Sequence, residues 1–221
     1  MKLKLVIVLL LKFGFAIGQD SNYPILSTKG GKIQDFIPKG WVLLDSVNGD
    51  LNKDGFADKA FIIDSNEEQN SNEQSVNKRT LVVVFYDTTA KHFNLIEQTS
   101  NLFSSLINKP NLFYEVMEIN KGTLAVTFMH AGSYPTIYDY KFRYQNNVFY
   151  LIGADKRYSK PSAYENYSFN FLSKKWSLTT GNDNSDESPV TVWKKLELPE
   201  LKTLKNFGGP NSWKIAEGIY L

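Results

Sequence analysis

Hydrophobic and polar residues alternate with a period of two along most of the chain after residue 33. The clearest run has aromatic residues separated by charged ones: Tyr138, Tyr140, Phe142 and Tyr144 alternate with Asp139, Lys141 and Arg143. Successive side chains of a β-strand point to opposite faces, so this period predicts half-buried strands. Polar turn residues at 145–147 are followed by renewed alternation at Phe149 and Leu151, which predicts a β-hairpin over residues 137–153.

The next segment repeats this pattern. At an offset of 27 residues, five hydrophobic positions of the first hairpin match five of the second: Tyr140 with Tyr167, Phe142 with Phe169, Tyr144 with Phe171, Phe149 with Trp176, and Leu151 with Leu178. A weak internal repeat of hairpins is therefore expected.

Other segments follow the same plan. Residues 81–86 are expected to pair with 93–97, and 114–119 with 123–129, which brings the total to about ten strands. Short helices are expected only near 102–107 and 200–206, and the polar segments 66–78 and 181–188 are expected to be loops. The predicted fold class is mainly β, with antiparallel hairpins forming a sandwich, a meander or a partial propeller-like assembly.

The first eighteen residues have the pattern of a signal peptide. Lys2 and Lys4 precede an unbroken apolar run over residues 5–11, and Ala16 and Gly18 are small residues at the cleavage positions. The apolar run has seven residues before Lys12, whereas a bilayer span needs about 20. We therefore expect cleavage, no stable membrane span afterwards, and a periplasmic or secreted product. Residues 19–32 are predicted to be a flexible lead-in, and residues 33–221 a single antiparallel β domain.

Composition narrows the possible functions. Hydrophobic residues make up 42% of the chain and aromatic residues 14%, which is typical of a packed globule. Without residues 1–18 the chain has 22 basic and 23 acidic residues, so its net charge is −1 and nucleic acid is not an expected partner. The chain has no cysteine, which excludes disulfides and thiolate chemistry.

One loop has the residue spacing of a calcium site. Oxygen-bearing side chains occupy its positions 1, 3, 5 and 9: Asp50, Asn52, Asp54 and Asp58. Gly55 at position 6 permits a sharp turn, and Phe56 at position 7 would contribute its backbone carbonyl, with its ring left to pack against the domain. Calcium takes six to eight hard oxygen ligands, so these five residues are the predicted ligands of a structural Ca²⁺. The alternative is an Asx-rich turn that needs no metal.

The surroundings of this loop differ from those of an EF-hand, which needs helices on both sides and a bidentate Glu at position 12, where this chain has Phe61. Strand-like segments at 41–47 and 57–64 flank the loop instead. In this respect it resembles the calcium loops of FG-GAP repeats in integrin-type β-propellers, over about 25 residues. The resemblance implies an ion held at the tip of a β-hairpin.

A wider resemblance covers most of residues 35–205. The string that begins Tyr140-Lys-Phe-Arg-Tyr-Gln-Asn-Asn and continues to Leu151-Ile-Gly-Ala-Asp, with Asn170-Phe-Leu and Thr179-Thr-Gly-Asn, is similar to a group of uncharacterised exported bacterial proteins. This resemblance implies export and β architecture, and it implies no particular activity.

No catalytic residue is assigned. His92 and His130 have no partner motif nearby, and the carboxylate pairs Glu115 with Glu118 and Asp183 with Asp186 are ordinary for a solvated surface. Three tyrosines in loop-like stretches could instead stack on a sugar or contact a protein: Tyr134, Tyr158 and Tyr164. The expected function is an exported non-catalytic β domain that binds a protein or glycan partner. The alternative is a hydrolase acting on cell-wall or extracellular polymers.

Overall fold

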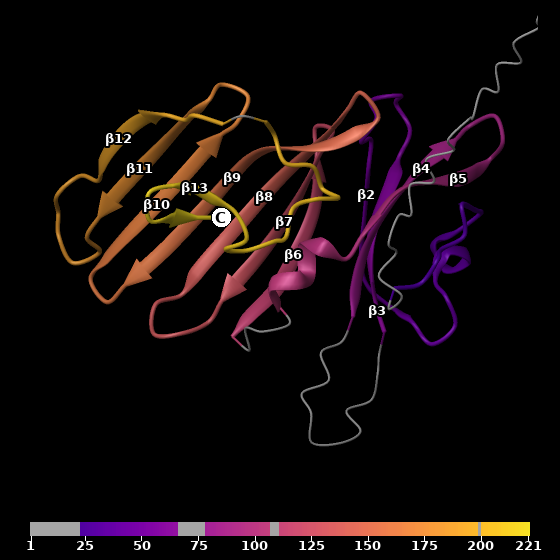
Figure 1. Ribbon diagram of the computed structural model, residues 1–221, viewed down its shortest axis with the longest axis horizontal. Helices are drawn as coiled ribbons and strands as arrows, with labels where there is room; N and C mark the ends of the chain where they lie inside the picture. Colours follow the sequence, from indigo (N-terminus) through magenta and orange to yellow (C-terminus); the bar gives the residue numbers. More distant parts are fainter. Residues whose placement is uncertain (1–22, 66–77, 107–110, 199) are drawn as a thin grey trace, which may run out of the picture.

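The computed structural model describes residues 23–65, 78–106, 111–198 and 200–221. Its fold is mainly β, which confirms the predicted fold class, and the strands follow one another in two antiparallel meanders (Figure 1). The signal peptide pattern and most of the polar segment 66–78 lie outside the described residues.

The first sheet has five strands in the order β1-β5-β4-β3-β2. Their bounds are β1 (Lys29–Gly30), β2 (Val42–Gly49), β3 (Asp58–Asp64), β4 (Arg79–Asp87) and β5 (His92–Thr99). Both faces of β3 are buried: Ala60 and Ile62 belong to the main core, whereas Phe61 and Ile63 belong to a second, smaller core. A strand buried on both faces needs a continuous apolar run, which residues 60–63 supply.

The smaller core changes the role expected for the lead-in. Leu26 is buried in it, and Lys29 and Gly30 pair with Asn94 and Phe93 of β5. The 3₁₀ helix η1 (Ile33–Phe36) adds Phe36 to the same core. The ordered fold therefore starts before residue 33. The sequence did not predict this, because a single buried leucine and a two-residue strand are too short to show a hydrophobic period.

The second sheet has seven strands in the order β12-β11-β10-β9-β8-β7-β6. Their bounds are β6 (Leu112–Asn120), β7 (Thr123–His130), β8 (Thr136–Gln145), β9 (Val148–Lys160), β10 (Ala163–Asn170), β11 (Lys175–Gly181) and β12 (Val190–Lys195). All the hairpins expected from the alternation are present. Strand β12 was not expected, because hydrophobic and polar residues do not alternate regularly along it. All six of its residues are exposed.

The repeated hydrophobic positions lie on one face of this sheet, but their pairing differs between the two hairpins. Tyr144 of β8 lies opposite Phe149 of β9. In the second hairpin Trp176, the counterpart of Phe149, lies opposite Phe169, which is the counterpart of Phe142. The repeat therefore preserves the buried face while the register shifts by two residues, a change that keeps every side chain on its own face.

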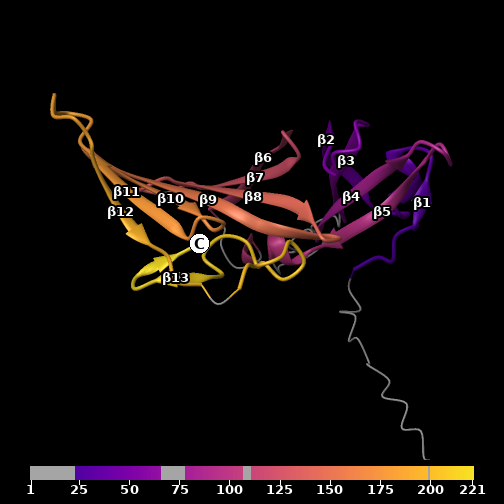
Figure 2. The same cartoon turned by 90° about the horizontal axis from the view of Figure 1, so that it is seen from above.

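The chain after β12 covers that face. Phe207 lies edge-on to Tyr140 with ring centroids 4.7 Å apart, and Trp213 lies 5.4 Å from Phe171. A small hairpin of β13 (Lys214–Ala216) and β14 (Ile219–Tyr220) follows, and the 3₁₀ helix η2 (Asn101–Leu106) packs Phe103 against the same core. Figure 2 shows the C-terminal segment on one side of the seven-stranded sheet, and none of the described segments lies over the other side.

The helix expected at residues 200–206 is absent from the described part of that segment. Thr203 instead forms a β-bridge with Tyr150, and a turn follows at 204–206. Leu151 donates its N–H to the carbonyl of Lys202, and Leu204 donates its N–H to the carbonyl of Phe149, each at 2.8 Å. The prediction was wrong because this stretch pairs with the part of β9 that β10 leaves free. The helix expected near 102–107 is confirmed over residues 102–106 as the 3₁₀ helix η2, and residue 107 lies outside the described residues.

The two sheets meet at β2 and β6. The Tyr114 hydroxyl of β6 donates a hydrogen bond to the Asp45 carboxylate of β2. One hydrophobic core includes buried residues from both sheets, among them Ile62 and Val83 of the first and Leu124 and Phe142 of the second. The loop between β2 and β3 lies next to this junction.

Candidate functional site

The loop that connects β2 to β3 contains four of the five predicted calcium ligands, and the fifth, Asp58, is the first residue of β3. It closes a β-hairpin in which Gly49 lies opposite Asp58. Gly55 has φ of +89°, a left-handed conformation that glycine adopts without strain, as the tight turn requires. Lys53 is also left-handed, with φ of +66°.

Hydrogen bonds gather the first three oxygen-bearing side chains. The Asp50 carboxylate accepts N–H groups from three residues: Lys53 at 2.6 Å, Asp54 at 3.1 Å and Gly55 at 3.0 Å. The Asn52 side chain accepts the Asp54 N–H at 3.0 Å and donates its own amide to the Asp54 carboxylate at 2.9 Å. Asp54 in turn accepts the Phe56 N–H at 2.8 Å. Three side chains with oxygen atoms that could coordinate a metal are thus held together in one loop.

Asp58 has a different environment. Its side chain is fully buried, and one carboxylate oxygen accepts the N–H groups of Leu51 at 2.9 Å and Asn52 at 3.3 Å. The other oxygen accepts the N–H of Tyr86 in β4 at 3.1 Å. Burial raises the pKa of Asp58 above its ordinary value, although these N–H groups act in the opposite direction. Asp58 therefore fastens the loop to its own start and to the neighbouring strand.

The side-chain oxygens of the loop meet some of the requirements of a calcium ion. Calcium prefers hard oxygen ligands, which Asp50, Asn52 and Asp54 offer side by side. A carboxylate has about four acceptor positions, so Asp50 and Asp58, with three N–H bonds each, retain acceptor capacity. In the described part of the chain, no three His, Asp or Glu side chains are grouped as a metal site would need. An ion here would depend on the Asn52 amide and on backbone carbonyls as well as on carboxylates.

The Phe56 ring is half exposed and is not part of either hydrophobic core, contrary to the expectation that it packs against the domain. The loop instead contacts the second sheet through the turn between β6 and β7. A Cβ atom on Gly122 would lie 3.0 Å from Cε of Lys53 and 3.6 Å from the carbonyl oxygen of Asp50. The predicted ion loop thus lies where the two sheets meet.

The catalytic candidates are dispersed. His92 begins β5 of the first sheet, and its ring nitrogens lie 3.2 Å from the Ala90 carbonyl and 3.1 Å from the Asn94 side chain. His130 ends β7 of the second sheet. Glu115 and Glu118 are both exposed on β6. Asp183 and Asp186 lie in the connection between β11 and β12.

Of the three tyrosines expected in loop-like stretches, only Tyr134 lies in a loop, since Tyr158 is on β9 and Tyr164 on β10, and the three do not form one patch. The rings of Tyr134 and Tyr158 lie 5.9 Å apart. Tyr164 pairs with Ser159, the residue that follows Tyr158 on β9, so alternation places Tyr164 on the opposite face. There it lines a hollow of about 340 Å³ together with Arg157 and Asp183.

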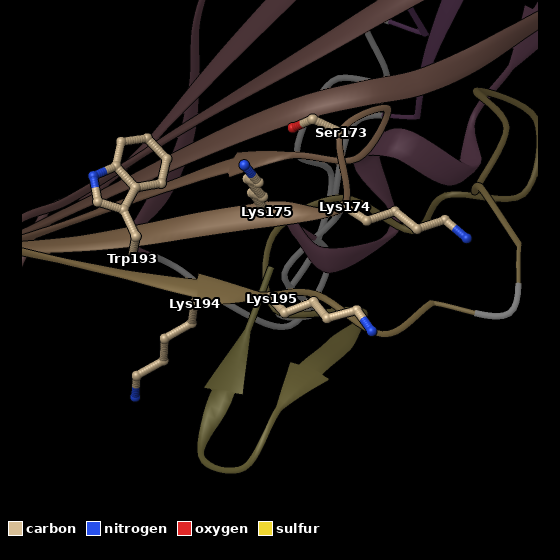
Figure 3. Close-up of a pocket in the computed structure, with 6 residues that line it drawn as sticks. All are labelled: Ser173, Lys174, Lys175, Trp193, Lys194 and Lys195. Atoms are coloured by element: carbon tan, nitrogen blue, oxygen red, sulfur yellow. The ribbon is translucent and has the colours of Figure 1, made fainter.

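The sequence analysis did not predict a second candidate region, a group of exposed apolar residues on β12. Val190, Val192 and Trp193 are 61%, 48% and 68% exposed, respectively. Trp193 borders an open hollow of about 840 Å³, lined by Ser173, Lys174, Lys175, Trp193, Lys194 and Lys195 (Figure 3). The one available signal was the string Val190-Thr-Val-Trp-Lys-Lys, in which three consecutive β-branched residues and a tryptophan precede two adjacent lysines.

Comparison with known proteins gave no match, whether to a protein-family model, to a curated protein or to a solved structure. None of the helices in the described ranges has the length and apolar character needed to cross a bilayer.

Proposed function

We propose that this protein is an exported, non-catalytic β module that binds a macromolecular partner at the β12 edge of its seven-stranded sheet. The observation that carries this proposal is the exposure of Val190, Val192 and Trp193 together on one edge strand. Single exposed apolar residues are normal on a protein surface, whereas three of them among the six residues of one edge strand, with Val190 and Val192 on one face and Trp193 on the other, indicate an interaction site at that edge. The export part of the proposal rests on the signal peptide pattern of residues 1–18.

The tryptophans of the chain support this choice of surface. Trp176 is buried and Trp41 and Trp213 are partly buried, whereas Trp193 is 68% exposed. Tryptophan is enriched among the residues that dominate binding energy, because its large ring gains most from losing water. The C-terminal segment covers the aromatic face of the sheet elsewhere, for example at Tyr140, but all six residues of β12 stay exposed.

We also propose that the loop of residues 50–58 binds Ca²⁺ in a structural role. Asp50, Asn52 and Asp54 would provide side-chain oxygens, Phe56 its carbonyl, and Asp58 its remaining acceptor capacity. Backbone N–H groups already satisfy much of the negative charge of the loop, so the ion would add to a formed structure. Its position beside Gly122 would let it stiffen the junction between the sheets.

Partner capture tests the binding proposal. The full-length mature protein is immobilised and exposed to periplasmic extract and culture medium of the source organism, and retained proteins and glycans are identified. We expect a partner that wild type retains and Trp193→Ala loses. Phe113→Ala is the matched control, because Phe113 is a half-exposed aromatic residue on β6, at the opposite edge of the same sheet. A retained set that Trp193→Ala leaves unchanged would contradict the proposal.

A further inference from the structure

The β12 strand has a free backbone edge. It is the terminal strand of the seven-stranded sheet, and among the described residues it pairs only with β11. Its outer N–H and C=O groups can therefore accept a further strand. Proteins usually protect such an edge with charged residues, and the distribution of charge here indicates which kind of strand would be accepted.

Four lysines gather at this end of the sheet. Lys175 of β11 lies directly opposite Lys195 of β12, and Lys174 and Lys194 are their neighbours along the chain. Like charges directly opposite each other on a sheet are destabilising. Lys174 also adopts a left-handed conformation, with φ of +52°. The repulsion between Lys175 and Lys195 and the left-handed backbone of Lys174 are thus two unfavourable features at the same place.

These lysines have no ionic partner within the described part of the chain. The recorded ion pairs of the second sheet involve other lysines and arginines, such as Lys141 with Asp155. The Lys194 ammonium lies 5.1 Å from the centre of the Trp176 ring, a cation–π contact. Glu197 borders a neighbouring hollow with Lys174 and Lys195 but forms no ion pair with either. The cluster therefore keeps a net positive charge.

The lysines are divided between both faces of the edge. Residues of a strand alternate, so Trp193 and Lys195 lie on one face and Val192 and Lys194 on the other. Figure 3 shows the side chains of Trp193 and Lys194 on opposite sides of the strand. A sugar stacked on the Trp193 ring would reach one face only. An extended peptide alternates its own side chains and reaches both.

We propose that β12 accepts an acidic, extended segment of a partner protein as an eighth strand of the sheet. Main-chain hydrogen bonds to β12 hold the segment, carboxylates on one of its faces pair with Lys175 and Lys195, and carboxylates on the other pair with Lys194. A second copy of this chain is a poorer occupant, because β12 contains no acidic residue to neutralise these lysines. This inference rests on the proposed binding function and specifies the chemistry of the partner.

The test uses three labelled peptides of equal length, in which pairs of threonines alternate with pairs of glutamate, glutamine or lysine residues, so that each bound strand presents its variable side chains on both faces. Fluorescence anisotropy with the full-length mature protein is expected to show binding of the glutamate peptide at least tenfold tighter than of the other two. This binding should weaken at least tenfold between about 50 and 500 mM salt, since charge pairing is screened. Methylation of all backbone nitrogens of the glutamate peptide should abolish binding, because neither edge of the methylated peptide can then donate to β12.

Charge reversal locates the site. Lys194→Glu combined with Lys195→Glu should lose the glutamate peptide and gain the lysine peptide. Lys39→Glu combined with Lys91→Glu is the control, since both lysines are exposed, lie away from the second sheet and give the same change of net charge. Circular dichroism and urea midpoints verify that each variant folds.

Several results would overturn the acidic-strand proposal: no glutamate-peptide binding at millimolar concentration, equal binding of the glutamine peptide, or no effect of backbone methylation or of the Lys194/Lys195 reversal. Tighter binding of an acidic polysaccharide that displaces the peptide would assign the site to a glycan instead. If the reversal has no effect on a captured partner that Trp193→Ala still loses, the binding function stands and only the acidic strand is refuted.

Discussion

Gly49 of β2 lies against the side chain of Ile119 of β6, with no space between them for a Cβ atom. This contact occurs where the two sheets meet, one residue before the loop of residues 50–58. The close approach of the two strands therefore depends on the missing side chain at position 49, and the hydrogen bond from Tyr114 to Asp45 links the same strands elsewhere along the junction.

Gly49→Ala should destabilise the protein by about 1–3 kcal/mol, because the added methyl group overlaps Ile119 and must displace one strand. The free energy of unfolding from urea titration measures this effect. Gly31→Ala is the control, since its Cβ would meet only the Asp35 carboxylate at an ordinary 3.6 Å. Equal stability of the two variants would show that β2 and β6 are not packed this closely.

Two tyrosines on β8 should respond oppositely to loss of their hydroxyl groups. Tyr140 is fully buried and its hydroxyl has no hydrogen-bond partner among the described residues, whereas the Tyr138 hydroxyl is paired with the Asn211 side chain. Tyr140→Phe should be neutral or stabilising by up to about 1 kcal/mol, and Tyr138→Phe should cost about 0.5–1.5 kcal/mol. Urea unfolding of both variants compares them. A marked loss of stability in Tyr140→Phe would mean that its hydroxyl is bonded.

Glu97 on β5 should make stability depend on pH. Burial raises its pKa above the ordinary value of 4.5, although Lys205 acts in the opposite direction. A raised carboxyl pKa gives a contribution to stability that is present below the ordinary pKa and lost as the pH rises through the raised one. The stability of Glu97→Gln relative to wild type should therefore increase between about pH 4 and pH 7, as measured by urea unfolding at each pH.

Glu165 on β10 offers a control of opposite sign. The hydrogen bond from Lys160 at 2.6 Å, followed by the one from Tyr167 at 2.9 Å, lowers the pKa of Glu165. Its contribution is present above the ordinary pKa and lost as the pH falls through the lowered one. Glu165→Gln should accordingly lose stability relative to wild type as the pH rises. Parallel trends for the two variants would contradict these environments.

Calcium should raise the melting temperature of the wild-type protein. At a free concentration ten times the dissociation constant, binding contributes about 1.4 kcal/mol, which corresponds to roughly 3–5 °C for a chain of this size. Asp54→Ala should melt at the same temperature with calcium and with chelator, because it removes one of the gathered oxygens. Identical melting of wild type in both conditions would favour the metal-free Asx-rich turn.

Asp58→Asn should behave differently from Asp54→Ala. The variant places an amide N–H₂ among three backbone N–H groups that need an acceptor, which should cost about 1–3 kcal/mol with or without calcium. Chemical unfolding in chelator isolates this structural effect. A loss of stability seen only when calcium is present would instead identify Asp58 chiefly as an ion ligand.

The sequence by itself determined the local features of this protein. The alternation around Phe142 assigned its strand and its buried face, because side chains of a strand must alternate whatever the strand packs against. The turn chemistry of residues 50–58 was equally local: Asp50, Asn52 and Asp54 bond to backbone groups within five residues of themselves. Such interactions need no distant partner, so a one-dimensional pattern reveals them.

Tertiary structure alone decided the rest. Leu26 is buried because η1 and the first sheet meet around it, and Thr203 forms a β-bridge because β9 offers free backbone groups there. Asp58 faces the N–H of Tyr86, which lies 28 residues away. Trp193 is exposed on β12, the terminal strand of its sheet among the described residues. Each of these outcomes depends on which distant backbone or side chain becomes the neighbour of the residue. The identity of the residue itself does not encode its tertiary neighbours.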